Sequence, residues 1–194
     1  MSNFVKLKKK IGNFKKTIKV PGDKSLSIRW VLFASLANGT SKAKNLLMSE
    51  DVVAAIDAIK KLGIKVIANK KECKIYGKGV NGYKYKKNLK INAQNSGTLG
   101  RLILGLLVNT PKPVTLVGDK SLSKRDFKRV TDPLSKFGAK FQLRNNNFLP
   151  LKIYGTSKLK PIKYNENKGS AQCKSSIIFA AMRSDGTTII RAKK

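Results

Sequence analysis

Residues 95–110, with the sequence NSGTLGRLILGLLVNT, carry the pattern on which the fold depends. A small polar loop leads into an apolar run, and a polar turn ends that run. A run that is apolar on every side predicts a helix covered by neighbours on every side. The same order surrounds the apolar runs 28–37 and 173–182. We therefore expect one unit to recur, twice in full and a third time in part.

A second helix and a strand complete each full unit. After the first apolar run, Val52 and Ile59 belong to the apolar stripe of a predicted amphipathic helix. Ser49 is the candidate N-cap of this helix, and Gly63 is the residue at which it is expected to end. The strand-like residues 64–67 follow. A similar helix and strand follow the second apolar run. Alternation of helix and strand predicts the α/β class.

Composition limits the possible classes of protein. With 194 residues, of which 41% are hydrophobic and 27% charged, we expect one domain or one and a fraction. No apolar run reaches the roughly 18–20 residues of a membrane span, and no secretory signal follows the basic N-terminus. Two cysteines without any histidine exclude a disulfide scaffold, most zinc sites, and Ser-His or Cys-His catalysis. The reducing cytoplasm is the expected compartment.

The charge is strongly basic, with 42 Lys+Arg against 10 Asp+Glu and a formal net charge of +32. Two interpretations stay open: a nucleic-acid-binding protein, or a solvated lysine-rich surface. The lysines are spread along the whole chain, which favours the solvated surface. Arginine occurs only seven times in this lysine-rich chain. Each arginine is therefore a candidate for a site where the planar guanidinium group, with its two-pronged hydrogen bonding, is required.

The polar loop before each apolar run is a candidate binding site. The serines of these loops have a simpler interpretation as ordinary N-caps. However, Arg29, Arg101 and Arg125 lie in or beside such loops, and cations converging over Gly/Ser backbone predict a site for small phosphorylated or carboxylated molecules. Gly97 is either a simple turn residue or a point where backbone approaches a ligand. The ten acids form no convincing acid/base pair, so no catalytic residue is assigned.

Four segments in this order resemble the 5-enolpyruvylshikimate-3-phosphate synthase (3-phosphoshikimate 1-carboxyvinyltransferase) family. They are PGDKSLSIR at 21–29, NSGTLGRL at 95–102, GDKSLSKR at 118–125 and SAQCKS at 170–175. The resemblance extends over residues 19–194. It departs from the family pattern after the third segment, where an aspartate, residue 126, stands in place of the usual proline.

The resemblance implies the enolpyruvyl transferase fold, with two similar domains of three βαβαββ units and buried parallel helices. Residues 1–20 would then be strands belonging to the second, largely missing domain. Residues 21–194 would form the first substrate-binding domain, with its third unit cut short. The chain is thus expected to be an N-terminal fragment, inactive alone, of a monomeric enzyme about twice as long.

The reaction implied by the resemblance transfers the enolpyruvyl group of phosphoenolpyruvate to the 5-hydroxyl of shikimate 3-phosphate and releases phosphate. It needs no metal and no organic cofactor. By the same resemblance, the residues expected to bind shikimate 3-phosphate are Lys24, Ser25, Arg29, Ser170, Ala171 and Gln172. Those expected to bind phosphoenolpyruvate are Lys24, Gly97, Arg101, Arg125 and Gln172. A nucleic-acid-binding protein on the same fold, or a non-catalytic scaffold, remains the alternative.

Overall fold

The fold is that of a computed structural model, which describes residues 6, 8, 12, 13, 15–69, 72–167 and 169–192. Its helices are α1 (Lys24–Leu36), α2 (Glu50–Lys61), α3 (Gly97–Leu107), α4 (Lys128–Ser135) and α5 (Ala171–Ala181), with the short 3-10 helix η1 (Leu122–Lys124). Its strands are β1 (Asn38–Lys44), β2 (Lys65–Ala68), β3 (Glu72–Lys78), β4 (Leu89–Asn92), β5 (Val114–Val117), β6 (Lys140–Arg144), β7 (Phe148–Tyr154), β8 (Lys163–Glu166) and β9 (Ile189–Ala192).

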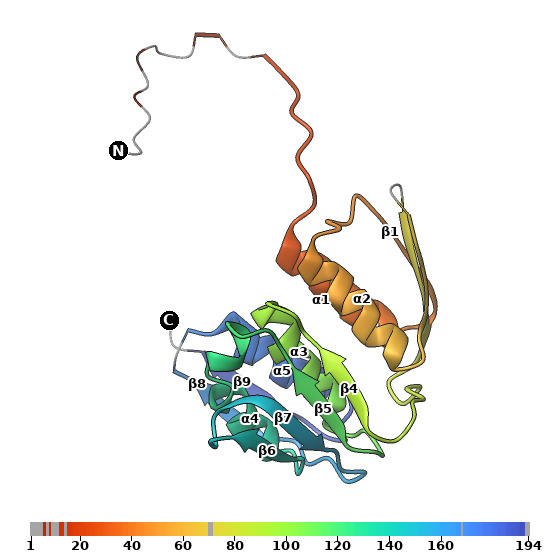
Figure 1. Ribbon diagram of the computed structural model, residues 1–194, viewed down its shortest axis with the longest axis vertical. Helices are drawn as coiled ribbons and strands as arrows, with labels where there is room; N and C mark the ends of the chain where they lie inside the picture. Colours follow the sequence, from red (N-terminus) through yellow and green to blue (C-terminus); the bar gives the residue numbers. More distant parts are fainter. Residues whose placement is uncertain are drawn as a thin grey trace.

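The first unit packs α1 and α2 against an antiparallel sheet with the strand order β1-β3-β2 (Figure 1). Strand β3 turns Cys73 and Ile75 into the core, as alternation along a half-buried strand requires. Gly77 lets β3 pass close to the end of α1, because a Cβ at this position would lie 2.3 Å from the carbonyl oxygen of Ala37. The sheet is thus anchored directly to the helix that begins with the first polar loop.

The second unit forms a mixed sheet in the order β4-β5-β7-β6, where β4 and β5 are parallel and the other pairs antiparallel. Helices α3 and α4 belong to this unit. The third unit contributes α5 and the parallel pair β8-β9. The α/β class and the repeated unit predicted from the sequence are therefore confirmed.

Helix α3 is the centre of the core, with every residue but one buried. It packs tightly on α5 because Gly105 has no side chain: a Cβ there would lie 2.1 Å from the carbonyl oxygen of Ser176. Each of the three predicted apolar helices is present and begins two to four residues before its apolar run. The polar loop residues therefore supply the first helical turns.

Helix α1 departs from the prediction that neighbours cover it on every side. Leu26 is 68% exposed and Phe33 is 41% exposed. The Phe33 ring contacts the Phe179 ring of α5, tilted by 40° at 4.4 Å between centroids. Ile178 of α5 and Met182, the C-cap of α5, are exposed as well. Apolar residues on α1 and α5 thus form an uncovered apolar face, which we define by Leu26, Phe33, Ile178 and Met182.

The segment before α1 is the one expected to supply strands to a second domain. Residues 15–20 extend away from the body without forming a strand (Figure 1), as do residues 6, 8, 12 and 13. The rest of residues 1–20 lies outside the described part of the chain. Because the expected strands would pair with a second domain, their formation stays a prediction. In the ranges that the structure describes, no helix has the length and apolar character needed to cross a membrane.

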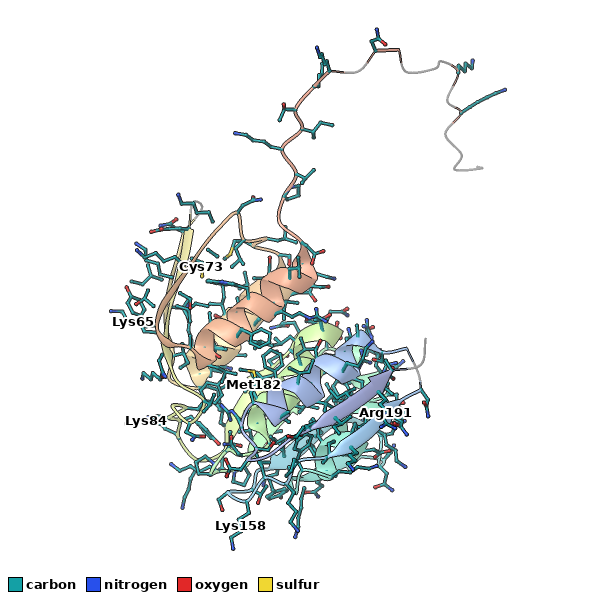
Figure 2. All side chains as sticks on the ribbon, turned by 180° about the vertical axis from the view of Figure 1, so that it is seen from behind. Lys65, Cys73, Lys84, Lys158, Met182 and Arg191 are labelled. Atoms are coloured by element: carbon teal, nitrogen blue, oxygen red, sulfur yellow. The ribbon has the colours of Figure 1, made fainter. Side chains whose placement is uncertain are left out.

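Lysines project from several sides of the molecule. In Figure 2, the labelled Lys65, Lys84 and Lys158 lie on separate parts of the outline rather than in one patch. They come from β2, from the loop after β3 and from the loop after β7. This arrangement fits the solvated-surface interpretation of the charge better than a single nucleic-acid-binding face.

Candidate functional site

The first turns of α1, α3 and α5 meet at one end of the molecule. Gln172 on α5 donates from Nε2 to Thr98 Oγ1 at 3.1 Å and accepts from Arg101 Nη1 at 2.7 Å, both on α3. Arg29 on α1 donates from Nε and Nη2 to Ser175 Oγ on α5, at 3.3 and 3.1 Å. Side chains from three predicted loops therefore form one cluster, although the loops lie far apart in the sequence.

Of the three loop serines that have the simpler interpretation as N-caps, two are N-caps. Ser96 and Ser170 each accept a hydrogen bond from the backbone N–H three residues on, at 3.2 Å. For α1 the expectation was wrong, because Asp23 is the N-cap and accepts the equivalent bond at 2.7 Å. Ser25 instead lies inside the first turn of α1. A helix N-terminus with its positive dipole end and unpaired N–H groups faces each loop.

Lys24 lies at the start of α1, beside the start of α2. Its Nζ lies 3.7 Å from the Asp51 carboxylate, and half of the Lys24 side chain is exposed. An exposed pair at this distance is weak, of the order of 0–1 kcal/mol. An anionic ligand can therefore draw Lys24 away from Asp51 at small cost.

Arg101 is the buried cation of the site, with only 6% of its surface exposed. Its guanidinium lies over the Phe127 ring at 5.5 Å and donates from Nη2 to the carbonyl oxygen of Asp126 at 3.2 Å. Burial, followed by the charges of Arg129 and Arg125, lowers the pKa of Arg101 to about 10, while Asp126 acts in the opposite direction. Arg101 therefore stays charged at neutral pH in a place where a charge is costly.

Arg125 is held by a chain of hydrogen bonds that sequence analysis missed. It donates from Nη2 to Asn95 Oδ1 at 3.2 Å, and Asn95 Nδ2 donates to Asp119 Oδ2 at 2.6 Å. Asp119 also accepts from the backbone N–H of Leu122 at 2.7 Å. The hydrogen bond from Asn95, followed by that from Leu122, holds the pKa of Asp119 below its usual range. Asp119, ionised at neutral pH, thus orients the amide that faces Arg125.

Gly97 lies between the guanidinium groups of Arg101, on α3, and Arg125, which follows η1. A Cβ at Gly97 would lie 3.1 Å from Arg101 Nη1 and 3.1 Å from Arg125 Nη1. Its φ is not in the left-handed region, so no turn requires glycine here. Of the two interpretations left open, the structure therefore favours close approach: glycine leaves space between two cations.

Two acids in this part of the molecule accept hydrogen bonds from the backbone. Asp126 stands where the family pattern has proline, and its Oδ1 accepts from the backbone N–H of Lys128 at 2.7 Å, at the start of α4. Glu166 is buried and accepts from the backbone N–H of Ser170 at 3.0 Å, which ties β8 to the loop before α5. The sequence carried no signal for Glu166, because its role depends on where β8 ends. Ala171 begins α5 and is exposed.

Comparisons with known proteins add an independent line of evidence. A family model described as EPSP synthase (3-phosphoshikimate 1-carboxyvinyltransferase) matches residues 8–194. A 3-phosphoshikimate 1-carboxyvinyltransferase of Streptococcus agalactiae is 43% identical over 191 residues, covering 98% of this chain and 44% of that protein. The enzyme of the same name from Bacillus subtilis is 41% identical over 174 residues, covering 89% of this chain and 40% of that protein.

Solved structures agree. The structure of an EPSP synthase from Acinetobacter baumannii superposes with a TM-score of 0.86 at 34% identity, covering 91% of this chain and 40% of that one. The enolpyruvyl transferase NikO from Streptomyces tendae gives a TM-score of 0.60 at 12% identity, which shows a shared fold alone. The chain spans under half the length of the relatives that it matches.

Proposed function

The chain belongs to the EPSP synthase family, and from this premise we propose that its cation cluster binds the substrates of an enolpyruvyl transfer. The proposed reaction moves the enolpyruvyl group of phosphoenolpyruvate to the 5-hydroxyl of shikimate 3-phosphate and gives 5-enolpyruvylshikimate 3-phosphate and phosphate. It would serve the shikimate pathway and, through chorismate, the biosynthesis of aromatic amino acids. No metal or organic cofactor takes part in the proposal.

The observation that carries the proposal is the position of Gln172. Its amide contacts the α3 loop through Thr98 and Arg101, while its own helix is tied to α1 through Arg29. One amide thus stands between the two groups of residues that would hold the two substrates. The residues proposed for shikimate 3-phosphate are Lys24, Ser25, Arg29, Ser170, Ala171 and Gln172. Those proposed for phosphoenolpyruvate are Lys24, Gly97, Arg101, Arg125 and Gln172.

The chemistry suits such a cluster. Two anionic molecules must approach each other before a bond can form, and their repulsion opposes this approach. Fixed guanidinium and ammonium groups lower the repulsion and orient both molecules. We assign no catalytic acid or base, so the property to measure on the 194-residue chain is binding. We place the activity in the cytoplasm, where the free thiols of Cys73 and Cys173 would stay reduced. A monomeric state stays a prediction.

The test is a titration of the purified chain with shikimate 3-phosphate, followed by the fluorescence of Trp30, which is next to Arg29. We expect saturable binding that is lost in an Arg29→Gln variant. The charge-matched control is Lys140→Gln, because Lys140 is exposed at the start of β6, outside the proposed site. Inorganic phosphate and a single-stranded oligonucleotide serve as comparison ligands.

Two results would count against the proposal. Equal binding by the Arg29→Gln and Lys140→Gln variants would remove the site from α1. Tight oligonucleotide binding with a steep dependence on salt, and no response to shikimate 3-phosphate, would instead favour the nucleic-acid alternative.

A further inference from the structure

Arg101, Arg125 and Arg129 form what we call the arginine cluster. The two other members both lower the pKa of Arg101, after burial itself, and Arg129 does so more strongly than Arg125. The guanidinium groups of Arg125 and Arg129 therefore both lie within electrostatic reach of Arg101. Neither a sequence motif nor the proposed substrate sites include Arg129.

The position of Arg129 follows from the packing of α4 on α5. Arg129 is the second residue of α4, and its carbonyl oxygen accepts from Cys173 Sγ at 3.4 Å. Cys173 directly follows Gln172, so the start of α4 rests against the first turn of α5. Arg129 is half-buried, and its Nε is shielded from solvent without a hydrogen-bond acceptor. The same is true of Arg101 Nε.

Asp126 acts electrostatically on Arg101 and Asp119 on Arg125, but within the described part of the chain neither carboxylate forms an ion pair with the cluster. The ion pairs found there are Lys24–Asp51 and Lys74–Glu72, and neither involves these arginines. The Asp126 carboxylate, the acid that acts on Arg101, hydrogen-bonds to backbone instead. Buried charges are normally paired, and buried donors without partners call for an explanation such as a missing ion. A bound anion would neutralise the cluster.

We propose that Arg129 is a third guanidinium of the phosphoenolpyruvate site and that the arginine cluster holds the phosphate group as a dianion. This inference rests on the proposed function and deepens it by adding a residue and a charge requirement. Three guanidinium groups match the charge and the several oxygens of a phosphate group better than they match those of a single carboxylate. Sequence analysis could not find Arg129, because only the fold brings the start of α4 to the loop before α5.

The experiment compares Arg129→Gln with Lys128→Gln. Lys128 is the neighbouring residue on α4, is exposed, and loses the same charge on substitution. The first probe is inorganic phosphate, and the readout is the thermal unfolding midpoint relative to chloride at equal ionic strength. We expect phosphate to raise the midpoint of the wild-type chain and of Lys128→Gln, but not of Arg129→Gln. The second probe is phosphoenolpyruvate with saturating shikimate 3-phosphate, for which we expect Arg129→Gln to raise the Kd roughly tenfold to hundredfold.

The outcomes separate the two ideas. Equal phosphate responses in Arg129→Gln and Lys128→Gln overturn the role of Arg129 and leave the proposed function standing. A wild-type response to phosphate without any response to phosphoenolpyruvate and shikimate 3-phosphate overturns the proposed function, and with it the assignment of Arg129 to that site. If Arg129→Gln does not fold, Arg129→Lys replaces it in the experiment. This variant keeps the charge but lacks the planar guanidinium, so it should bind phosphate more weakly than the wild-type chain. Unchanged phosphate binding overturns the inference.

Discussion

Substitution of Gly97 by alanine tests the spacing between two cations, Arg101 on α3 and Arg125 after η1. The new Cβ would lie 3.1 Å from Arg101 Nη1 and 3.1 Å from Arg125 Nη1, a few tenths of an ångström closer than ordinary contact. Arg101 is held by Gln172, by a backbone carbonyl and by an aromatic ring, whereas the exposed Arg125 has Asn95 as its side-chain partner. We therefore expect Arg125 to move, and the methyl group to occupy space meant for the ligand.

The expected loss is that of about one hydrogen bond to a charged group. Such a bond contributes about 1.5–3 kcal/mol, which corresponds to a roughly 10- to 150-fold rise in the Kd of phosphoenolpyruvate. Folding should change much less, because the crowded atoms are the ends of flexible side chains and alanine favours a helix by up to about 1 kcal/mol over glycine. Binding of shikimate 3-phosphate should stay near its wild-type value, since Gly97 lies outside the residues proposed for that ligand.

The assay titrates phosphoenolpyruvate into the chain with saturating shikimate 3-phosphate and measures urea unfolding in parallel. Gly100→Ala is the matched control on the same helix. Its Cβ would meet the Phe127 ring at 3.3 Å and Ala93 Cβ at 3.6 Å, but no cation. Equal phosphoenolpyruvate affinity in Gly97→Ala and wild type would refute the argument, and so would a loss of equal size in Gly100→Ala.

Three other changes test the packing, the electrostatics and the fork geometry. Gly105→Ala should lower the free energy of unfolding by about 2–3 kcal/mol, because its Cβ would strike the Ser176 carbonyl at 2.1 Å; an unchanged urea midpoint would contradict this. Asp119→Asn should lower stability near pH 6, because a carboxyl whose folded-state pKa lies below the unfolded-state value of about 4 stabilises the fold above that value. This stabilisation is lost as the pH falls through the folded-state pKa. The difference in urea midpoint between wild type and Asp119→Asn should therefore shrink as the pH falls from 6 to 3. A difference that stays constant over this range would refute this role of Asp119. Arg101→Lys keeps the charge but loses the planar fork whose Nη1 and Nη2 donate to Gln172 and to the Asp126 carbonyl, so phosphoenolpyruvate affinity should fall. Unchanged affinity by calorimetry would show that charge alone suffices.

Much of the fold was predictable because its local signals are strong. The apolar runs of α1, α3 and α5 begin and end at polar loops, and two of the three N-cap serines cap as expected. The exposed side of α1 was not predictable, because its apolar run resembles that of the buried α3. Whether a helix is covered depends on which neighbours reach it, and composition within one run does not contain that information.

The candidate site divides in the same way. Arg29, Arg101 and Arg125 were found because each lies in or beside a polar loop. Asn95 belongs to one of the four segments that resemble the family. Its hydrogen-bond partners, however, are distant in the sequence: Arg125 is 30 residues away and Asp119 is 24 residues away. Such contacts arise only when β4, β5 and the turn after β5 are placed together. A sequence pattern shows which side chains are chemically suited, while tertiary packing decides which of them meet.

The uncovered apolar face of α1 and α5 has a consequence for how the chain behaves as a colloid. Copies that each carry a net charge of +32 repel one another over a range of about 30 Å at 0.01 M salt, but only about 8 Å at 0.15 M. At the higher ionic strength, Leu26 and Phe33 of one molecule can approach those of another before repulsion grows large. We therefore expect light scattering to rise with added salt, the reverse of what salt does to a protein that associates through opposite charges.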